Sequence, residues 1–203
     1  MEQERPAGEP GVADGVEDGA RQAELRVPDP SAMRDLGREL ADALRPGDLV
    51  LLTGELGAGK TTLARGVGEG LDVRGAVTSP TFVIARVHPP LGDGPALVHV
   101  DAYRLAGGLD EMEDLDLDAS LPESVTLVEW GEGRVEELTD DRLHVMIERA
   151  VGAEAGPEGG DDVRTVRLLG VGARWSAGDG AERLRRLARW APSATASRKG
   201  DRG

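Results

Sequence analysis

The residues with the clearest chemical meaning are at positions 54–62, where the sequence reads Gly-Glu-Leu-Gly-Ala-Gly-Lys-Thr-Thr. The spacing from Gly54 through Gly59 to Lys60 and Thr61 is that of a nucleotide phosphate-binding loop. Without a Cβ, the glycines take positive φ and bring backbone N–H groups close to a β-phosphate. The lysine adds a compact cation beside the β- and γ-phosphates, and the threonine hydroxyl is a ligand for Mg²⁺. The stretch therefore predicts a loop that binds a nucleoside triphosphate.

Such a loop requires a strand before it and a helix after it, and the sequence predicts both. Residues 49–52 are a continuous apolar run that fits a buried strand. The following helix is predicted by an apolar stripe at helical spacing, Leu63, Val67 and Leu71. Its N-terminus directs a positive partial charge at the bound anion, and we expect the glycines near Gly68 and Gly70 to end it. The loop residues expected to contact the nucleotide are Gly54, Glu55, Leu56, Gly57, Ala58, Gly59, Lys60, Thr61 and Thr62.

Two carboxylates are predicted to complete the site. Residues 96–100 form an apolar-leaning run that ends in Asp101, the pattern of a strand that delivers a carboxylate to bound Mg²⁺. Residues 125–128 resemble a strand buried on both faces, and Glu129 at its end is interpreted as a Mg²⁺ ligand or as the residue that orients the attacking water. A helix N-cap is the alternative for this glutamate. The predicted metal ligands are Thr61, Asp101 and Glu129, and the predicted catalytic residues are Lys60, Asp101 and Glu129.

A hydroxyl-rich segment at residues 78–82, Thr-Ser-Pro-Thr-Phe, precedes a predicted strand. Such a loop is able to sense the γ-phosphate, becoming ordered when the phosphate is present and relaxing when it leaves. A plain turn rich in Ser and Thr explains the same residues. Both interpretations stay open for this segment.

The residue types that the chain lacks exclude several other functions. With no cysteine, the chain has no disulfide, thiolate metal site or cysteine nucleophile. The histidines His88, His99 and His144 lack metal-binding spacing, so no zinc site is expected. His99 is expected to be structural, on the face of its strand opposite Val98 and Val100. The chain contains no asparagine and so lacks the Asn-Lys-x-Asp segment with which guanine-specific proteins read the base, which makes ATP the expected nucleotide.

Charge and hydropathy bear on partners and location. The formal net charge is -14, so the chain is not expected to grip a nucleic acid backbone by itself. Lys60 and Lys199 are the only lysines, and a compact ammonium suits a place beside phosphates. No apolar run is long enough to cross a membrane, and the first residues do not resemble a signal peptide. We therefore expect a cytoplasmic protein without membrane contact.

The order of predicted elements favours an α/β fold of the P-loop NTPase type, with a mixed sheet flanked by helices in a single domain with disordered tails. We expect a disordered acidic extension over residues 1–24, the ATPase domain over 25–170 with a flexible insertion at 150–162, a helical extension over 171–191 and a disordered tail over 192–203.

Local patterns predict the individual elements. Ser31 is the predicted N-cap of a helix whose apolar stripe is Met33, Leu36, Leu40 and Leu44. Residues 81–87 and 96–100 predict an antiparallel hairpin, and residues 109–121 an acidic, partly helical surface segment. The other predicted strands are 25–27, 142–148 and 163–169, and a basic amphipathic helix is predicted at 182–190.

Four motifs in this order resemble the TsaE family, the bacterial ATPases of tRNA threonylcarbamoyladenosine biosynthesis. They are residues 54–63, 79–82, 99–105 and 128–131. The resemblance implies a P-loop fold with a mixed sheet between helices, Mg²⁺-ATP binding and ATP hydrolysis that is weak in isolation. It also implies a complex with TsaD and TsaB, which bind tRNA and transfer the threonylcarbamoyl group to adenosine 37. Hydrolysis in this family is thought to reset the complex between turnovers.

The resemblance also implies roles for individual residues. Lys60 would bind phosphate, Thr61 and Glu129 would hold Mg²⁺ directly or through water, and Asp101 would be the strand carboxylate near the metal. Trp130 would pack beside the nucleotide or a partner.

Two further matches are less direct. Thr81 would belong to the phosphate-sensing loop. Arg164 is the match for the region that contacts adenine and ribose, which the insertion at 150–162 interrupts.

Two other functions fit a phosphate-binding loop. A P-loop kinase for a small molecule or sugar shares the Gly-Lys-Thr-Thr sequence, but its usual arginine-rich lid has no obvious counterpart here. A non-catalytic binding module, in which the bound nucleotide alone signals, is the third hypothesis.

Overall fold

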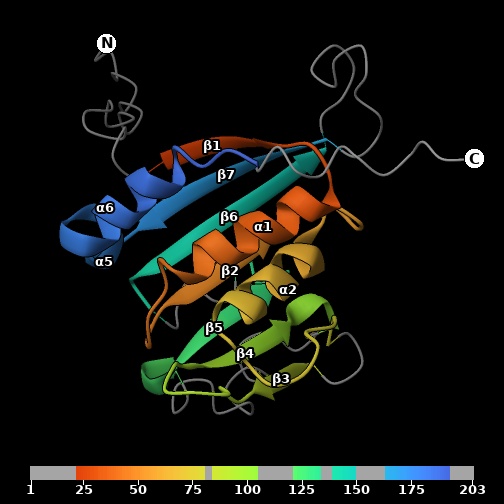
Figure 1. The fold of residues 1–203 in the computed structure, drawn as a ribbon, viewed down its shortest axis with the longest axis vertical. Coiled ribbons are helices and arrows are strands. Elements are labelled where there is room, and N and C mark those ends of the chain that lie inside the picture. Colours follow the sequence, from red (N-terminus) through yellow and green to blue (C-terminus); the bar gives the residue numbers. More distant parts are fainter. Residues whose placement is uncertain (1–21, 81–83, 105–120, 134–138, 150–162, 193–203) are drawn as a thin grey trace, which may run out of the picture.

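The computed structural model describes residues 22–80, 84–104, 121–133, 139–149 and 163–192, and its centre is a seven-stranded sheet in the order β1-β7-β6-β2-β5-β4-β3 (Figure 1). The strands are β1 (Gln22–Val27), β2 (Leu49–Thr53), β3 (Ala85–His88), β4 (Ala96–Asp101), β5 (Ser124–Glu129), β6 (Arg142–Arg149) and β7 (Arg164–Val171). The helices are α1 (Pro30–Ala41), α2 (Lys60–Gly70), α5 (Ala173–Ser176) and α6 (Gly178–Leu187), with short 3-10 turns η2 (Ala102–Arg104) and η3 (Leu121–Glu123).

The sheet is mixed, as predicted. Strands β6, β2, β5 and β4 run parallel, whereas β1, β7 and β3 pair antiparallel with their neighbours. Because β2, β5 and β4 are parallel, their carboxyl ends meet at one edge of the sheet. There Asp101 is the register partner of Glu129, and Glu129 is also paired with Leu52, next to the phosphate-loop motif. Residues that are far apart in the sequence are thus brought together at this edge.

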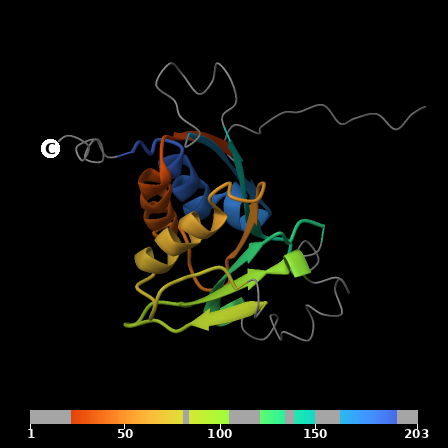
Figure 2. The ribbon, with the colours of Figure 1, turned by 90° about the vertical axis from the view of Figure 1, so that its right-hand side faces the viewer.

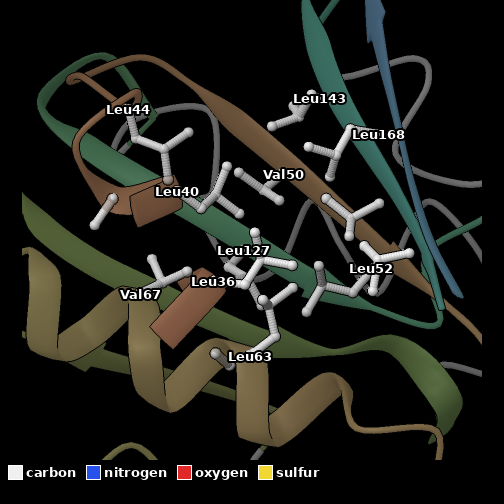
Figure 3. Close-up of a cluster of buried hydrophobic side chains, with 14 of the residues drawn as sticks. Leu36, Leu40, Leu44, Val50, Leu52, Leu63, Val67, Leu127, Leu143 and Leu168 are labelled. Carbon is white, nitrogen blue, oxygen red and sulfur yellow. The ribbon is translucent and has the colours of Figure 1, made fainter. Parts of the chain in front are cut away.

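All four helices pack on the same face of the sheet (Figure 2). The apolar stripe predicted for α1 is buried, and its leucines Leu36 and Leu40 contact the same cluster as Leu63 and Val67 of α2 (Figure 3). A second, smaller cluster lies on the opposite face of the central strands. Strand β5 is buried along its whole length because both of its faces are covered, as its continuous apolar run predicted.

The N-terminus of α1 differs from the prediction. Asp29, not Ser31, is the N-cap, and its carboxylate accepts a hydrogen bond of 2.9 Å from the backbone N–H of Ala32. Pro30 occupies the first helical position, where its missing N–H costs nothing and its fixed φ suits the helix. The proline therefore moves the start of the helix toward the N-terminus, and the predicted cap at Ser31 is wrong.

Helix α2 ends at Gly70, as its glycines predicted, and Gly66 and Gly70 also serve its contact with α1. Helix α2 continues through Gly66 and Gly68 to Gly70. A Cβ on Gly66 would run into the backbone carbonyl of Arg34, and a Cβ on Gly37 would meet that of Leu63. The absence of side chains at these positions lets the two helices approach until their backbones touch, which fixes α2 and the loop at its N-terminus.

We expect Gly66→Ala to lower the free energy of unfolding by about 1–3 kcal/mol, because the added methyl group overpacks this contact despite the better helix propensity of alanine. Chemical denaturation monitored by circular dichroism measures the change. Gly92→Ala is the control, since a Cβ there meets nothing within 4 Å. Equal stability of the Gly66→Ala variant and the wild type would contradict the account of this helix pair.

The C-terminal helices α5 and α6 contribute to the same hydrophobic core as the strands and helices α1 and α2. Trp175, Leu184 and Leu187 lie in the main buried cluster. Arg174 is itself buried and ties α5 to the start of β2, donating from Nε and Nη2 to the two carboxylate oxygens of Asp48 at 3.0 and 3.1 Å. The helix predicted at 182–190 is α6, which begins earlier, at Gly178, and ends at Leu187, and the short helix α5 precedes it. Helices α5 and α6 thus pack against the sheet on which the site is built and help to hold β2 in place.

The predicted strands and hairpin are present with shifted ends. Strand β1 begins at Gln22, earlier than the boundary predicted at residue 24, because it pairs along its length with β7. The predicted hairpin consists of β3 and β4, with β3 limited to Ala85–His88. Several predictions concern residues outside the described ranges: Thr81, the acidic segment predicted over 109–121 except for Leu121, the insertion at 150–162 and the two terminal tails beyond 22–192.

Burial of His88 makes the stability of the hairpin depend on pH. Burial lowers the pKa of this imidazole, and the nearby charges of His99 and Arg86 lower it further. A 3.4 Å contact between Nδ1 and the Arg74 carbonyl has the opposite effect and raises the pKa. The unfolded chain therefore binds a proton at a higher pH than the folded chain. Stability is fully present above the ordinary histidine pKa of about 6.5 and is lost as the pH falls through the lower folded value.

We expect the melting temperature to fall between pH 7 and pH 5, and to fall less steeply in His88→Gln, which removes the titrating group. Thermal unfolding in a series of buffers measures both slopes. Identical slopes in the two proteins would show that His88 does not titrate in this way.

None of the helices in the described part of the chain has the length and apolar character that a membrane span requires.

Candidate functional site

A pocket of about 600 Å³ lies at the carboxyl ends of the parallel strands. It is bounded by the phosphate-loop motif, by the end of β4 and by the end of β5. The residues that line it are Leu56, Gly57, Gly59, Lys60, Thr61, Thr62, Ser79, Asp101, Tyr103, Glu129 and Trp130. Both predicted carboxylates thus share one cavity with seven residues that were predicted to contact the nucleotide. These are Leu56, Gly57, Gly59, Lys60, Thr61, Thr62 and Trp130.

The backbone of the loop has the conformation that its glycines predict. Gly54, Gly57 and Gly59 have φ angles of 147°, 75° and 116°, which residues with a Cβ rarely adopt. Gly59 is the N-cap of α2 and makes no side-chain capping bond. The free N–H groups at the start of α2 therefore face the pocket together with the positive end of the helix dipole, an arrangement that binds anions.

The Lys60 ammonium group is buried inside the loop. Its Nζ donates to the carbonyl oxygens of Gly54 at 2.7 Å and Glu55 at 3.0 Å. It also lies 3.7 Å from the centre of the Trp130 ring, within the range of a cation–π interaction. Burial lowers the pKa of Lys60, and the carboxylates of Glu129 and Asp101 oppose this by favouring the charged form.

Trp130 is held in an uncommon backbone conformation beside that ammonium group. Its φ is 62°, a left-handed value for a residue with a large side chain. Its ring packs against Tyr103, with the ring centres 5.4 Å apart. Strained residues of this kind persist where the surrounding structure holds them, often at ligand sites. The two aromatic rings form one wall of the pocket.

The two predicted acids are buried and have different partners. Glu129 accepts hydrogen bonds from the Thr61 hydroxyl, at 3.1 Å to Oε1 and 3.4 Å to Oε2. Asp101 accepts from the Ser79 hydroxyl at 3.2 Å and from the backbone N–H of Tyr103 at 3.1 Å. Both carboxylates are about 95% or more buried yet line the pocket, so each faces the place where a ligand would bind.

The chemistry of this donor set fits Mg²⁺ bound together with a nucleotide. One hydroxyl and two carboxylates supply hard oxygen ligands next to the phosphate loop. No group of three or more His, Asp and Glu side chains suited to a metal is found within the described ranges. Mg²⁺ seldom needs such a cage, because it keeps several waters and takes other ligands from substrate phosphates. The residues present therefore fit this ion only in combination with an anionic ligand.

Arg164 and Ala58 lie on the other side of the loop. The Arg164 guanidinium donates from Nε to the Ala58 carbonyl at 3.0 Å, and both line a smaller pocket of about 80 Å³ with Asp29 and Met33. Thr62 lines both pockets, so they adjoin at the loop. Gly54 and Glu55 line neither pocket and instead hold the Lys60 ammonium group.

Sequence reasoning missed two contributors to this site. Tyr103 follows Asp101 closely and is one of only five aromatic residues, a scarcity that could have marked it. His99 was assigned a structural role, and its side chain does lie opposite Val98 and Val100, but its Nε2 is 2.9 Å from Glu129 Oε1. Only the pairing of β4 with β5 brings these residues together, and nothing in their spacing indicates it.

Comparisons with known proteins agree with this geometry. The family described as "Threonylcarbamoyl adenosine biosynthesis protein TsaE" matches residues 27–155, more than half of the chain. The tRNA threonylcarbamoyladenosine biosynthesis protein TsaE of Streptomyces coelicolor is 72% identical over 147 residues, which are 72% of this chain and 96% of that protein. The Bacillus subtilis protein of the same name is 38% identical over 76% of this chain and 90% of its own length. The crystal structure of Bacillus subtilis YdiB has a TM-score of 0.62 and 32% identity, covering 83% of this chain and 95% of that one.

Proposed function

The chain belongs to the TsaE family, which takes part in tRNA threonylcarbamoyladenosine biosynthesis, and from this premise we propose that it is a Mg²⁺-dependent ATPase. We propose further that it hydrolyses ATP to ADP and phosphate in support of N6-threonylcarbamoylation of adenosine 37 in tRNA. The observation that carries the proposal is the pocket in which the phosphate loop, Thr61 and two carboxylates converge.

We propose the following roles for residues of the pocket in this reaction. The loop N–H groups and Lys60 bind the β- and γ-phosphates, and the lysine exchanges its present carbonyl partners for phosphate oxygens. Thr61, Asp101 and Glu129 would hold Mg²⁺ directly or through water, and the ion would supply positive charge beside the phosphates. Glu129 accepts a hydrogen bond from the attacking water, because its carboxylate lies beside Thr61 at the pocket wall. Trp130 packs against the nucleotide.

Arg164 is proposed to act on the ribose and adenine side. Its smaller pocket adjoins the phosphate loop through Thr62, as a nucleoside attached to the bound phosphates requires. ATP is the proposed nucleotide because the chain has no asparagine for the guanine-reading segment.

Partners of the TsaD and TsaB type are proposed to complete the site. Leu56 at the loop tip is 87% exposed and Tyr103 is 66% exposed, so the rim of the pocket presents apolar side chains to solvent. Exposed apolar groups at a functional rim suit contact with another protein. With a net charge of -14, the chain is proposed to meet tRNA only through these partners, in the cytoplasm.

The test is phosphate release from ATP by the purified chain, alone and with TsaD and TsaB type proteins. We expect slow release alone and faster release with the partners, both dependent on Mg²⁺. Rapid ATP consumption with a small hydroxyl compound and no partner protein would instead identify a kinase and contradict the proposal.

A further inference from the structure

His99 lies one layer below the pocket and is directed at Glu129. The imidazole is fully buried in the middle of β4, and its Nε2 is 2.9 Å from Oε1 of Glu129. Because a carboxylate oxygen only accepts, Nε2 carries the hydrogen of this bond. The other ring nitrogen, Nδ1, has no hydrogen-bond partner among the residues that the structure describes. Among the described residues, Glu129 is thus the hydrogen-bond partner of this buried imidazole.

The register of the strands explains the contact. Asp101 and Glu129 are paired across β4 and β5, and His99 is paired with Leu127. His99 lies two residues before Asp101 on the same strand, so both side chains project from the same face. Asp101 therefore reaches the pocket, while His99 lies behind the Glu129 carboxylate and does not line the pocket. A nucleotide in the pocket would contact Glu129 but not His99.

The two acids differ in what holds them. Asp101 is oriented by Ser79 and by the backbone of Tyr103. Glu129 is oriented by His99 and by the hydroxyl of Thr61. The hydroxyl is also a proposed metal ligand, so its geometry changes when a ligand binds, whereas His99 is enclosed by the core and stays in place. Its N–H is the fixed donor to Glu129 in both situations.

We propose that His99 is the positioning residue for Glu129. Its hydrogen bond fixes one carboxylate oxygen, so that the glutamate meets the metal–nucleotide complex in a single orientation. Groups that orient a metal-binding side chain typically change metal affinity about 10–100-fold when they are removed. This inference rests on the proposed function, since it assumes that Glu129 faces a divalent metal ion bound with nucleotide.

Two substitutions separate the hydrogen bond from packing. In His99→Gln the amide Nε2 is the same number of bonds from Cβ as Nε2 of histidine, so it can donate to Glu129. In His99→Met an apolar side chain of similar length and volume fills the space without a donor. His99→Asn is a third variant, with a donor too short to reach Glu129. A role in packing alone predicts no advantage of Gln over Met.

The experiment titrates Mn²⁺ into each protein saturated with ADP and follows free Mn²⁺ by electron paramagnetic resonance. ADP affinity in EDTA is measured by calorimetry, and thermal unfolding verifies that each variant is folded. We expect His99→Gln to bind Mn²⁺ like the wild type and His99→Met to bind it about 10–100-fold more weakly, with ADP affinity in EDTA unchanged in both. If the Met variant does not fold, the Asn variant takes its place with the same expectation.

If His99→Met, or His99→Asn in its place, bound Mn²⁺ as tightly as the wild type, the proposed role of His99 would be overturned. Equal losses in the Gln and Met variants would overturn it as well, because they would indicate a packing effect. A wild type that binds no Mn²⁺ with ADP would instead refute the metal–nucleotide site itself. Failure of the proposed function is therefore distinguishable from failure of this inference.

Discussion

Lys60→Ala is expected to reduce ATP turnover in the presence of partner proteins by at least about 100-fold, the size of effect found when a single group that stabilises transition-state charge is removed. The Nζ group of Lys60 is buried against the loop carbonyls within the pocket, and its removal takes away the cation proposed to bind the phosphates. Steady-state phosphate release measures the loss.

The same substitution is expected to leave the fold intact. Lys60 makes no ion pair within 4 Å in the described structure, and truncation at the pocket wall leaves the main hydrophobic cluster unchanged. Lys199→Ala, which removes the only other lysine, is the matched control for loss of a lysine charge and should retain full turnover. Wild-type turnover by Lys60→Ala would contradict the assignment of this residue to the phosphates.

Glu129→Gln is expected to lower ATP hydrolysis by about 100-fold or more while nucleotide remains bound. The amide keeps the shape of the side chain but removes the charge that faces Mg²⁺ and the attacking water. Single-turnover hydrolysis and calorimetric ADP binding in EDTA separate the two effects. The affinity measured without metal should stay close to that of the wild type, because the phosphate loop is unaltered.

Glu132→Gln is the control for this change, since Glu132 is exposed and close in sequence to Glu129. A Glu129→Gln protein that binds ATP, does not hydrolyse it and yet supports normal tRNA modification would identify a non-catalytic binding module. Binding alone would then carry the signal, and the proposal that ATP hydrolysis sustains tRNA modification would be refuted.

Much of the fold follows from patterns along the chain. The apolar run at residues 49–52 predicts β2, and the glycines after it predict the loop. Both features can be predicted because strand burial and positive φ depend on the residue types at those positions alone. Strand β5 is recognisable for the same reason, as burial on both faces requires a continuous apolar run. The start of α1 was misplaced because Pro30 and Asp29 compete with Ser31 for the same turn. The packing role of Gly66 was missed because its partner, α1, is distant in the sequence.

The site was predictable only in its local parts. The phosphate loop and the acids at strand ends are marked by their positions, and the structure brings both acids to one pocket. The contacts of Glu129 with Thr61 and His99 depend on strand order and register. These are properties of the whole sheet, which the spacing of single residues does not determine.

The central claim, that ATP turnover by this chain sustains tRNA modification, is tested most directly by counting modified tRNA molecules per TsaD–TsaB complex when the partner proteins are limiting. With ATP, Mg²⁺ and the wild-type chain, we predict many rounds of threonylcarbamoyladenosine formation per complex, and with Lys60→Ala no more than about one round, since hydrolysis is proposed to reset the complex. Sustained multiple turnover with Lys60→Ala, equal to that of the wild type, would contradict the account.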